Sequence, residues 1–163
     1  MPNQIKLLRH PMHPMLTDFP IALWVTSLLW DLIRIWRADI FWSQTAYWTL
    51  VVGMVSAVPA IVTGFLEFIV IPANHPVLKK GMAHLSVMIV ASGLFFASLA
   101  VRSGTSPDDA SKFWIAVALS GIGALVLMIG GWLGGDLVFQ YGVGTRLFSQ
   151  VSETQRPLQQ QGS

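Results

Sequence analysis

Charged residues are scarce in this sequence. They make up 11% of its 163 residues, whereas a soluble globular domain carries roughly 25%. Hydrophobic residues, in contrast, account for 53% of the chain. A water-facing surface cannot be built from this composition in the usual way, so most side chains must face lipid or other protein.

Cysteine is absent altogether, and basic residues are few. The lack of cysteine excludes disulfides, thiolate metal sites, c-type haem attachment and cysteine-ligated iron–sulfur clusters. The 10 Lys and Arg residues are spread thinly and form no basic stripe, so we expect no binding of nucleic acid. His, Asp, Glu, Tyr and Trp remain as the side chains that could carry chemistry.

Long uncharged runs divide the chain into four predicted membrane spans. A helix of about 20 apolar residues is long enough to cross a bilayer. We place the spans at about 19–37, 46–71, 82–101 and 113–135. The first run ends in Trp and Arg rather than in a small-residue cleavage site, which indicates a retained span and not a signal peptide. The sequence therefore predicts an all-α, integral membrane four-helix bundle with antiparallel, up-and-down spans.

Polar segments flank this transmembrane domain, which covers residues 19–141. Residues 1–18 form a lead-in rich in His and Pro, with Thr17 or Asp18 expected to cap the first helix. Residues 142–163 form a polar tail, and we expect its Gln- and Ser-rich end to be disordered. Lys and Arg slightly favour the side of the two termini. This bias predicts a multi-pass membrane protein with both termini in the cytoplasm.

Small residues are concentrated in the fourth span. Gly130 and Gly134 form one GxxxG motif, and Gly131 and Gly135 form another. This spacing lets helix backbones approach closely in lipid. The motifs favour packing within the chain, and they would also allow a homodimer through the fourth span.

The up-and-down topology brings several ionisable side chains to one face of the membrane. An ionisable group near the apolar depth is costly, so it usually has a partner or a purpose. We expect His13 and His84 to converge there from facing helices, where two neutral imidazoles could ligate a haem iron axially or, with a carboxylate, hold a divalent metal. The supporting candidates for a metal site are His10, Glu67 and Asp136.

Each of these residues also has a structural interpretation. His84 could simply hydrogen-bond between helices, and His13 could be an interfacial residue of the lead-in. Glu67 could pair with Lys79, Lys80 or a histidine, and Asp136 could pair with Arg146 or the lead-in. Asp31 is three residues from Arg34, a spacing that predicts an ion pair on the helix surface.

The chain resembles a bacterial membrane family, the domain of unknown function 2231 family. The resemblance is carried by HPMHPMLTDFPIALW at 10–24 and GWLGGDLVFQYGVGT at 131–145, with TGFLEFIVIP at 63–72 and GMAHLSVM at 81–88 between them. It covers about residues 8–146 and implies four spans in the bacterial inner membrane with no established activity. Some relatives are joined to iron–sulfur or cytochrome-like domains, which implies electron transfer. Asp18 and Tyr141 stand where relatives often carry histidines. The matching positions are His13, Pro14, Phe19, Pro20, His84, Gly134, Gly135 and Gly142.

Three classes of function remain open from the sequence. The first is a redox-associated subunit that holds haem b or a divalent metal and works with an electron-transfer protein. The second is a structural or scaffold membrane subunit without a cofactor. The third is a small transporter or channel component, although the spans offer few polar residues at mid-depth. The sequence contains no nucleophile–base pair, so we do not expect an enzyme that acts alone.

Overall fold

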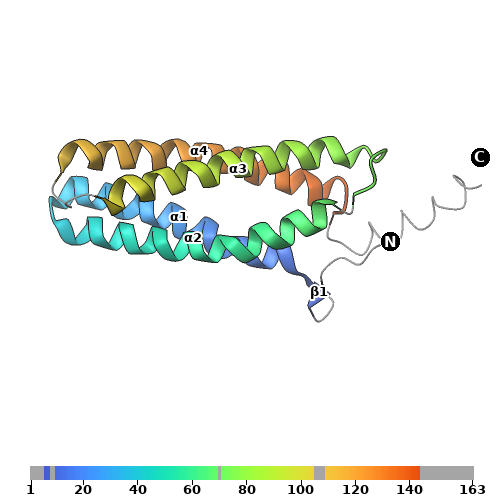
Figure 1. The fold of residues 1–163 in the computed structure, drawn as a ribbon, viewed down its shortest axis with the longest axis horizontal. Coiled ribbons are helices and arrows are strands. Elements are labelled where there is room, and N and C mark those ends of the chain that lie inside the picture. The colour runs from blue at the N-terminus through green and yellow to red at the C-terminus, as the bar shows by residue number, and fades with distance from the viewer. Residues whose placement is uncertain (1–5, 8–9, 70, 105–108, 144–163) are drawn as a thin grey trace, which may run out of the picture.

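The computed structural model describes residues 6–7, 10–69, 71–104 and 109–143. These residues form an elongated bundle of four helices (Figure 1). All four helices are long and apolar enough to cross a membrane. The helices are α1 (Met12–Arg37), α2 (Ile40–Ile69), α3 (Val77–Ser103) and α4 (Ala110–Phe139). The predicted all-α four-helix membrane bundle is therefore confirmed.

Two very short strands precede α1. The strand β1 (Lys6–Leu7) pairs antiparallel with β2 (His10–Pro11). The first helix then begins at Met12 instead of near residue 19, so neither Thr17 nor Asp18 caps it. Pro14 is the third residue of α1, where its missing N–H would have had no partner within the helix.

Most helix ends also lie outside the predicted apolar runs. The helix α3 continues to Ser103, and α4 begins at Ala110, where Asp109 caps it by accepting a hydrogen bond from the Lys112 backbone N–H at 3.2 Å. The reason is that an apolar run marks only the part of a helix that faces hydrocarbon, whereas the helix itself continues through the polar interface. The predicted disorder of the chain end concerns residues 144–163, which are outside the described part.

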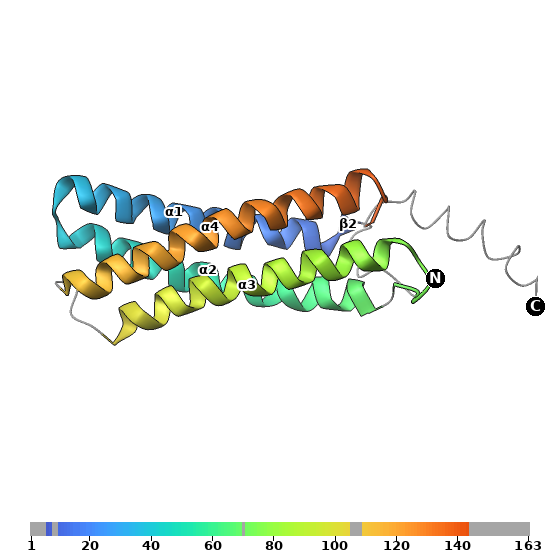
Figure 2. The ribbon, with the colours of Figure 1, turned by 90° about the horizontal axis from the view of Figure 1, so that it is seen from above.

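The four helices form two hairpins that lie side by side. In Figures 1 and 2, α1 runs beside α2, α3 runs beside α4, and α1 and α3 occupy opposite corners of the bundle. The link between α1 and α2 is only two residues long. Ala38 turns the chain there with a positive φ of 53°, and the Asp39 side chain accepts a hydrogen bond from the Phe41 backbone N–H at 2.9 Å.

The second hairpin repeats the burial pattern of the first. Each buried residue of α2 has a buried counterpart in α4, 70 residues later in the chain. Ala46 and Ala116 are one such pair. The other pairs are Leu50 and Ser120, Gly53 and Gly123, Ala57 and Leu127, and Ala60 and Gly130. Between α1 and α3 the shift is 71 residues, and the buried pairs are Pro20 and Ala91, Trp24 and Phe95, and Ser27 and Ser98.

The core lies where equivalent residues of the two hairpins meet. Trp24 and Phe95 stack with ring centroids 4.8 Å apart, and both side chains are almost fully buried. Residues in equivalent positions contact each other only near a symmetry axis. The two hairpins are therefore related by an approximate two-fold axis that runs along the bundle between α1 and α3.

Glycine is required where each of these rings passes its partner helix. A Cβ atom on Gly53 would lie 2.7 Å from Cδ1 of Trp24, and one on Gly123 would lie 3.2 Å from Cε2 of Phe95. The first distance is shorter than any side chain tolerates without a shift of its neighbours. Small residues thus pack the helices inside the chain.

Candidate functional site

Two histidines lie at the end of the bundle where α1 begins and α4 ends, and each reaches across its own hairpin. Nδ1 of His13, on α1, is 2.9 Å from the carbonyl oxygen of Ala60 on α2. Nδ1 of His84, on α3, is 3.0 Å from the carbonyl oxygen of Gly130 on α4. A carbonyl oxygen only accepts hydrogen bonds, so each Nδ1 is the donor. In the neutral ring, Nε2 then carries the lone pair.

Each imidazole lies close to a glycine of the partner helix, with its Cε1 atom nearest. A Cβ on Gly64 would lie 2.6 Å from Cε1 of His13, and a Cβ on Gly134 would lie 3.1 Å from Cε1 of His84. A side chain at Gly64 would push the ring of His13 away, and one at Gly134 would crowd His84. The two glycines therefore leave room for the rings, and the bonds to the carbonyl oxygens fix their tautomer.

The two histidines occupy equivalent places in the two hairpins. His13 and His84 are 71 residues apart, and so are Trp24 and Phe95, which lie further along the same two helices. They lie on α1 and α3, the helices that flank the approximate two-fold axis. Both sequence-predicted ligands are thus at the same end of the bundle, on diagonally opposed helices.

Glu67 lies beside His13 near the end of α2. Its carboxylate lies near the backbone of His13. Its Oε1 atom is buried and has no hydrogen-bond partner among the described residues. Of the partners that the sequence left open for Glu67, which were Lys79, Lys80 and a histidine, Lys80 binds another carboxylate.

That carboxylate is Asp136, whose Oδ2 atom is 2.6 Å from Nζ of Lys80. Its Oδ1 atom also accepts a hydrogen bond from Gln140 at 3.0 Å. Asp136 is therefore engaged in an ion pair between α3 and α4. His75, in the connecting segment, accepts a hydrogen bond from the Val77 backbone N–H at 3.2 Å.

A divalent metal ion finds little support in this arrangement. Residues 10–69, 71–104 and 109–143 contain no group of three or more His, Asp or Glu side chains placed to hold a metal ion. The side chain of His10, another candidate, lies outside the described part. The site reduces to a pair of imidazoles with a carboxylate nearby.

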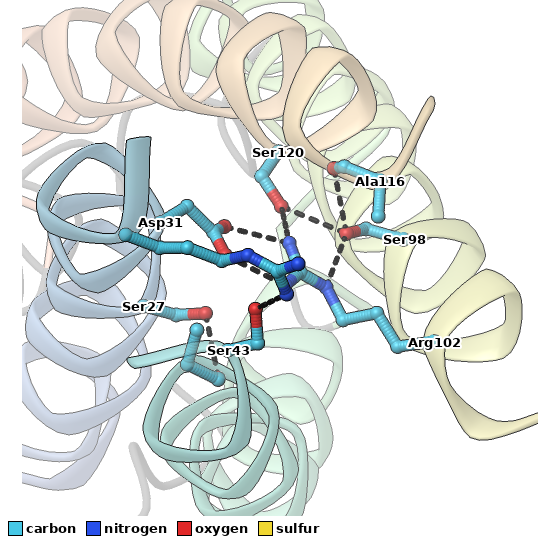
Figure 3. Close-up of polar contacts among 9 residues, drawn as sticks. Ser27, Asp31, Ser43, Ser98, Arg102, Ala116 and Ser120 are labelled. Atoms are coloured by element: carbon cyan, nitrogen blue, oxygen red, sulfur yellow. Dashed lines mark hydrogen bonds and ion pairs between the residues drawn. The ribbon is translucent and has the colours of Figure 1, made fainter. Parts of the chain in front are cut away.

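A second polar cluster lies at the opposite end of the bundle, and the sequence interpretation missed it (Figure 3). Asp31 of α1 accepts two hydrogen bonds from the guanidinium of Arg102 on α3, at 2.8 and 2.7 Å. Asp31 is fully buried, and the Arg102 side chain is only 8% exposed. The predicted surface ion pair with Arg34 is therefore wrong about where Asp31 lies, because its carboxylate points to the bundle interior.

Serine hydroxyls complete this second cluster. Nε of Arg102 donates to Ser98 at 3.2 Å, and Ser98 and Ser120 share a hydrogen bond of 2.8 Å. Ser98 also donates to the carbonyl oxygen of Ala116 at 2.8 Å, and Ser27 donates to that of Ala46 at 2.8 Å. The signal that could have revealed the cluster is the repeat, because Asp31 and Arg102 are 71 residues apart, like the two histidines.

The fold and these sites define a membrane protein made of two similar helical hairpins, polar at both ends and apolar between them. The family described as "Predicted membrane protein (DUF2231)" matches residues 9–147. The chain belongs to this family, as the resemblance of its two signature segments implied. Neither the curated proteins nor the solved structures contain a match to the chain.

Proposed function

We propose that the protein is a redox-associated membrane subunit that binds haem b between His13 and His84. The observation that carries this proposal is the tautomer of the two imidazole rings. Each donates Nδ1–H to a backbone carbonyl oxygen, which leaves Nε2 as the atom able to ligate iron. A hydrogen bond of this kind, on the nitrogen away from the metal, orients ligating histidines in general.

The surroundings of the two histidines also suit a haem. Two imidazoles from opposed helices could hold a haem without a third protein ligand, and His13 and His84 come from the diagonal pair α1 and α3. Gly64 and Gly134 hold the rings against the backbone. Bound haem would supply one-electron transfer. The protein would then exchange electrons with a partner protein at that membrane face.

Absorption spectroscopy tests this proposal directly. The protein is purified in mild detergent from cells supplied with a haem precursor, and haem is quantified per chain. We expect a Soret band close to one haem per chain that is lost in His13→Ala and in His84→Ala. His75→Ala is the matched control, because His75 lies at the same end of the bundle in the segment before α3, where it accepts a hydrogen bond from the Val77 backbone N–H, and it should keep the band. A colourless wild-type protein under these conditions would remove haem binding.

A scaffold subunit without a cofactor is the second candidate. Its support is that both histidines belong to a set of four equivalent bonds from a side chain to a backbone carbonyl, two in each hairpin. The set is His13 with Ala60, Ser27 with Ala46, His84 with Gly130, and Ser98 with Ala116. Such bonds join helices in lipid. If this is their only role, both histidine variants will lower stability while no chromophore is found in the wild type.

Transport is the least supported function. A path along the axis would have to pass the stacked rings of Trp24 and Phe95, which are packed against Leu50, Ala57 and Leu127. This apolar layer separates the histidines from the cluster of Asp31 and Arg102. Proteoliposomes of the wild-type chain should therefore take up no more ion than empty ones.

We also propose that the protein resides in the bacterial inner membrane with both termini in the cytoplasm. The bias in Lys and Arg supports this orientation, and it becomes larger once Arg102 is counted as a buried residue and not as a loop charge. A homodimer through α4 would have to use Gly131 and Gly135, because Gly130 and Gly134 already contact α3. A reporter enzyme that is active only in the cytoplasm should be active when it is fused after Ser163. Activity of a reporter that works only in the periplasm would contradict this orientation.

A further inference from the structure

We propose that the outer face of α1 binds a membrane-spanning helix of another protein, and that a Lys or Arg of this partner helix pairs with Asp18. Asp18 lies six residues after the start of α1 at Met12, and it is exposed on the outside of the bundle. Among the described residues, the ion pairs involve other carboxylates, and no hydrogen-bond donor reaches the Asp18 side chain. This inference does not depend on whether the histidines bind haem.

Contacts between α1 and α2 give the depth of Asp18 along the bundle. His13 lies beside Gly64, and Trp24 lies beside Gly53. Asp18, about midway between these two contacts on α1, is therefore level with about Pro59 of α2. From that level α2 continues for about ten residues, or about 15 Å, to its end at Ile69. All exposed side chains on this remaining part of α2 are hydrophobic, and they are Ile61, Val62, Phe65, Leu66 and Ile69.

The second hairpin places Asp18 on the hydrocarbon side of the interface as well. The residue equivalent to Asp18 on α3, 71 positions later, is Ile89, which is 63% exposed. Trp132 on α4 is 76% exposed, and its equivalent on α2, 70 positions earlier, is Val62. An exposed Trp marks the membrane interface, and Asp18 is about three residues, or about 5 Å, deeper than this level. A carboxylate at this depth usually has a partner or a function.

The outer face of α1 has the spacing of a helix-packing surface. Its exposed residues recur at alternating intervals of three and four, the spacing of a left-handed coiled-coil seam, which is also the commonest packing of helices in membranes. The line consists of Met15, Asp18, Ala22, Val25, Leu29 and Leu32. Ala22, one turn from Asp18, is small enough for a second helix backbone to approach. An equivalent line exists on α3, so the carboxylate is what distinguishes the face of α1.

A second copy of the chain does not supply the missing cation from its described residues. Copies in one membrane share an orientation, so Asp18 would meet residues of its own depth. On α3, Lys79 is ten residues before Ile89, or about 15 Å away along the helix, and Lys80 already binds Asp136. The other Lys and Arg side chains of the four helices lie at the opposite end of the bundle, and they are Arg34, Arg37, Arg102 and Lys112. The charge therefore favours a different membrane protein as the partner.

Disulfide cross-linking to a model helix tests this proposal. The chain contains no cysteine, so a single introduced cysteine reports on one face. Ala22→Cys reports on α1, and Gly93→Cys is the matched control at the equivalent place on α3, where nothing lies within 4 Å of the Cβ position. The probe is a synthetic membrane-spanning peptide of Leu and Ala with one Lys about one turn inside one end and one Cys four residues closer to its centre. Protein and peptide are mixed in phosphatidylcholine vesicles under mild oxidation.

We expect about ten times more peptide adduct with Ala22→Cys than with Gly93→Cys, the effect of one polar contact between membrane helices. Adding Asp18→Leu to Ala22→Cys, or replacing the Lys of the peptide by Leu, should remove this excess. Equal adducts at the two cysteines, or an adduct that survives Asp18→Leu, would overturn the proposal. A disulfide-linked dimer of Ala22→Cys that forms in preference to the peptide adduct would overturn the foreign partner and assign the face to a second copy.

Thermal unfolding in detergent separates a docking role of Asp18 from a role inside the chain. Asp18→Leu should unfold at a midpoint no lower than that of the wild type, because the carboxylate has no partner among the described residues and faces outward. A clearly lower midpoint would show that Asp18 stabilises the bundle itself, and it would overturn the proposal independently of the cross-linking result.

Discussion

The buried pair of Asp31 and Arg102 allows a quantitative prediction. In Arg102→Met, the carboxylate of Asp31 keeps its buried position but loses two charge-assisted hydrogen bonds of 2.8 and 2.7 Å. Each such bond contributes about 1.5–3 kcal/mol, and breaking a buried ion pair from one side costs about 3–5 kcal/mol. Ser98 and Ser120 still bond to each other. We therefore expect a loss of about 3–5 kcal/mol in the free energy of unfolding.

The reverse variant should be milder. In Asp31→Leu, Arg102 keeps its bonds to Ser98 and Ser120. It also lines a cavity of about 400 Å³ at this end of the bundle, so it can turn toward water. We expect a loss of about half the value for Arg102→Met. The double variant Asp31→Leu with Arg102→Met removes both charges together, and such apolar replacements are often close to neutral. It should recover to within about 1.5 kcal/mol of the wild type.

Equilibrium unfolding in mixed micelles, followed by circular dichroism, measures all three variants and gives the coupling free energy of the pair. A double variant that is more stable than Arg102→Met would show that the unpaired Asp31 carboxylate causes the loss of stability in Arg102→Met. A loss below about 1 kcal/mol in Arg102→Met, or a double variant that shows the sum of both single losses, would refute the reasoning.

Two further substitutions test the packing. Gly134→Val should lower the free energy of unfolding by about 1–3 kcal/mol through overpacking, because its side chain would meet the ring of His84. Gly131→Val should be nearly neutral, because nothing lies within 4 Å of its Cβ position. Equal losses in thermal unfolding would contradict this difference. Trp24→Phe should cost less than about 1.5 kcal/mol in the same assay, since Nε1 of Trp24 is buried without a hydrogen-bond partner among the described residues and the variant makes this position identical to Phe95. A loss above about 3 kcal/mol would indicate that the indole itself is needed.

The number and approximate extent of the spans could be predicted from the sequence, because long uncharged runs are a strong signal for lipid contact. Helix ends were harder to predict, since polar residues such as those before Phe19 are compatible with a helix that continues through the interface. The pairing of Asp31 with Arg102 could not be inferred from local spacing. The nearby Arg34 suggested a partner at i+3, whereas the real partner comes from the opposed helix.

The candidate site was predictable only in part. The up-and-down topology is sufficient to predict that His13 and His84 lie at one end of the bundle. It does not predict which carbonyl groups accept hydrogen bonds from their rings, because these bonds depend on how the two helices of each hairpin pack. The glycine motifs were ambiguous for a related reason. Gly130 and Gly134 contact α3, whereas Gly131 faces away, and only the rotation of α4 about its own axis distinguishes the two pairs.

The central claim is that the two hairpins are equivalent halves around one axis, and an exchange of charges tests it most directly. Asp31→Arg combined with Arg102→Asp moves each charge to the equivalent place in the other hairpin. In this exchange Ser27 already stands at the place equivalent to Ser98. Ser120, the other serine beside Arg102, has Leu50 as its equivalent, so Leu50→Ser and Ser120→Leu complete the exchange. Equilibrium unfolding should give this fourfold variant a stability well above that of Arg102→Asp alone and near that of the wild type. A fourfold variant no more stable than Arg102→Asp would contradict the equivalence of the halves.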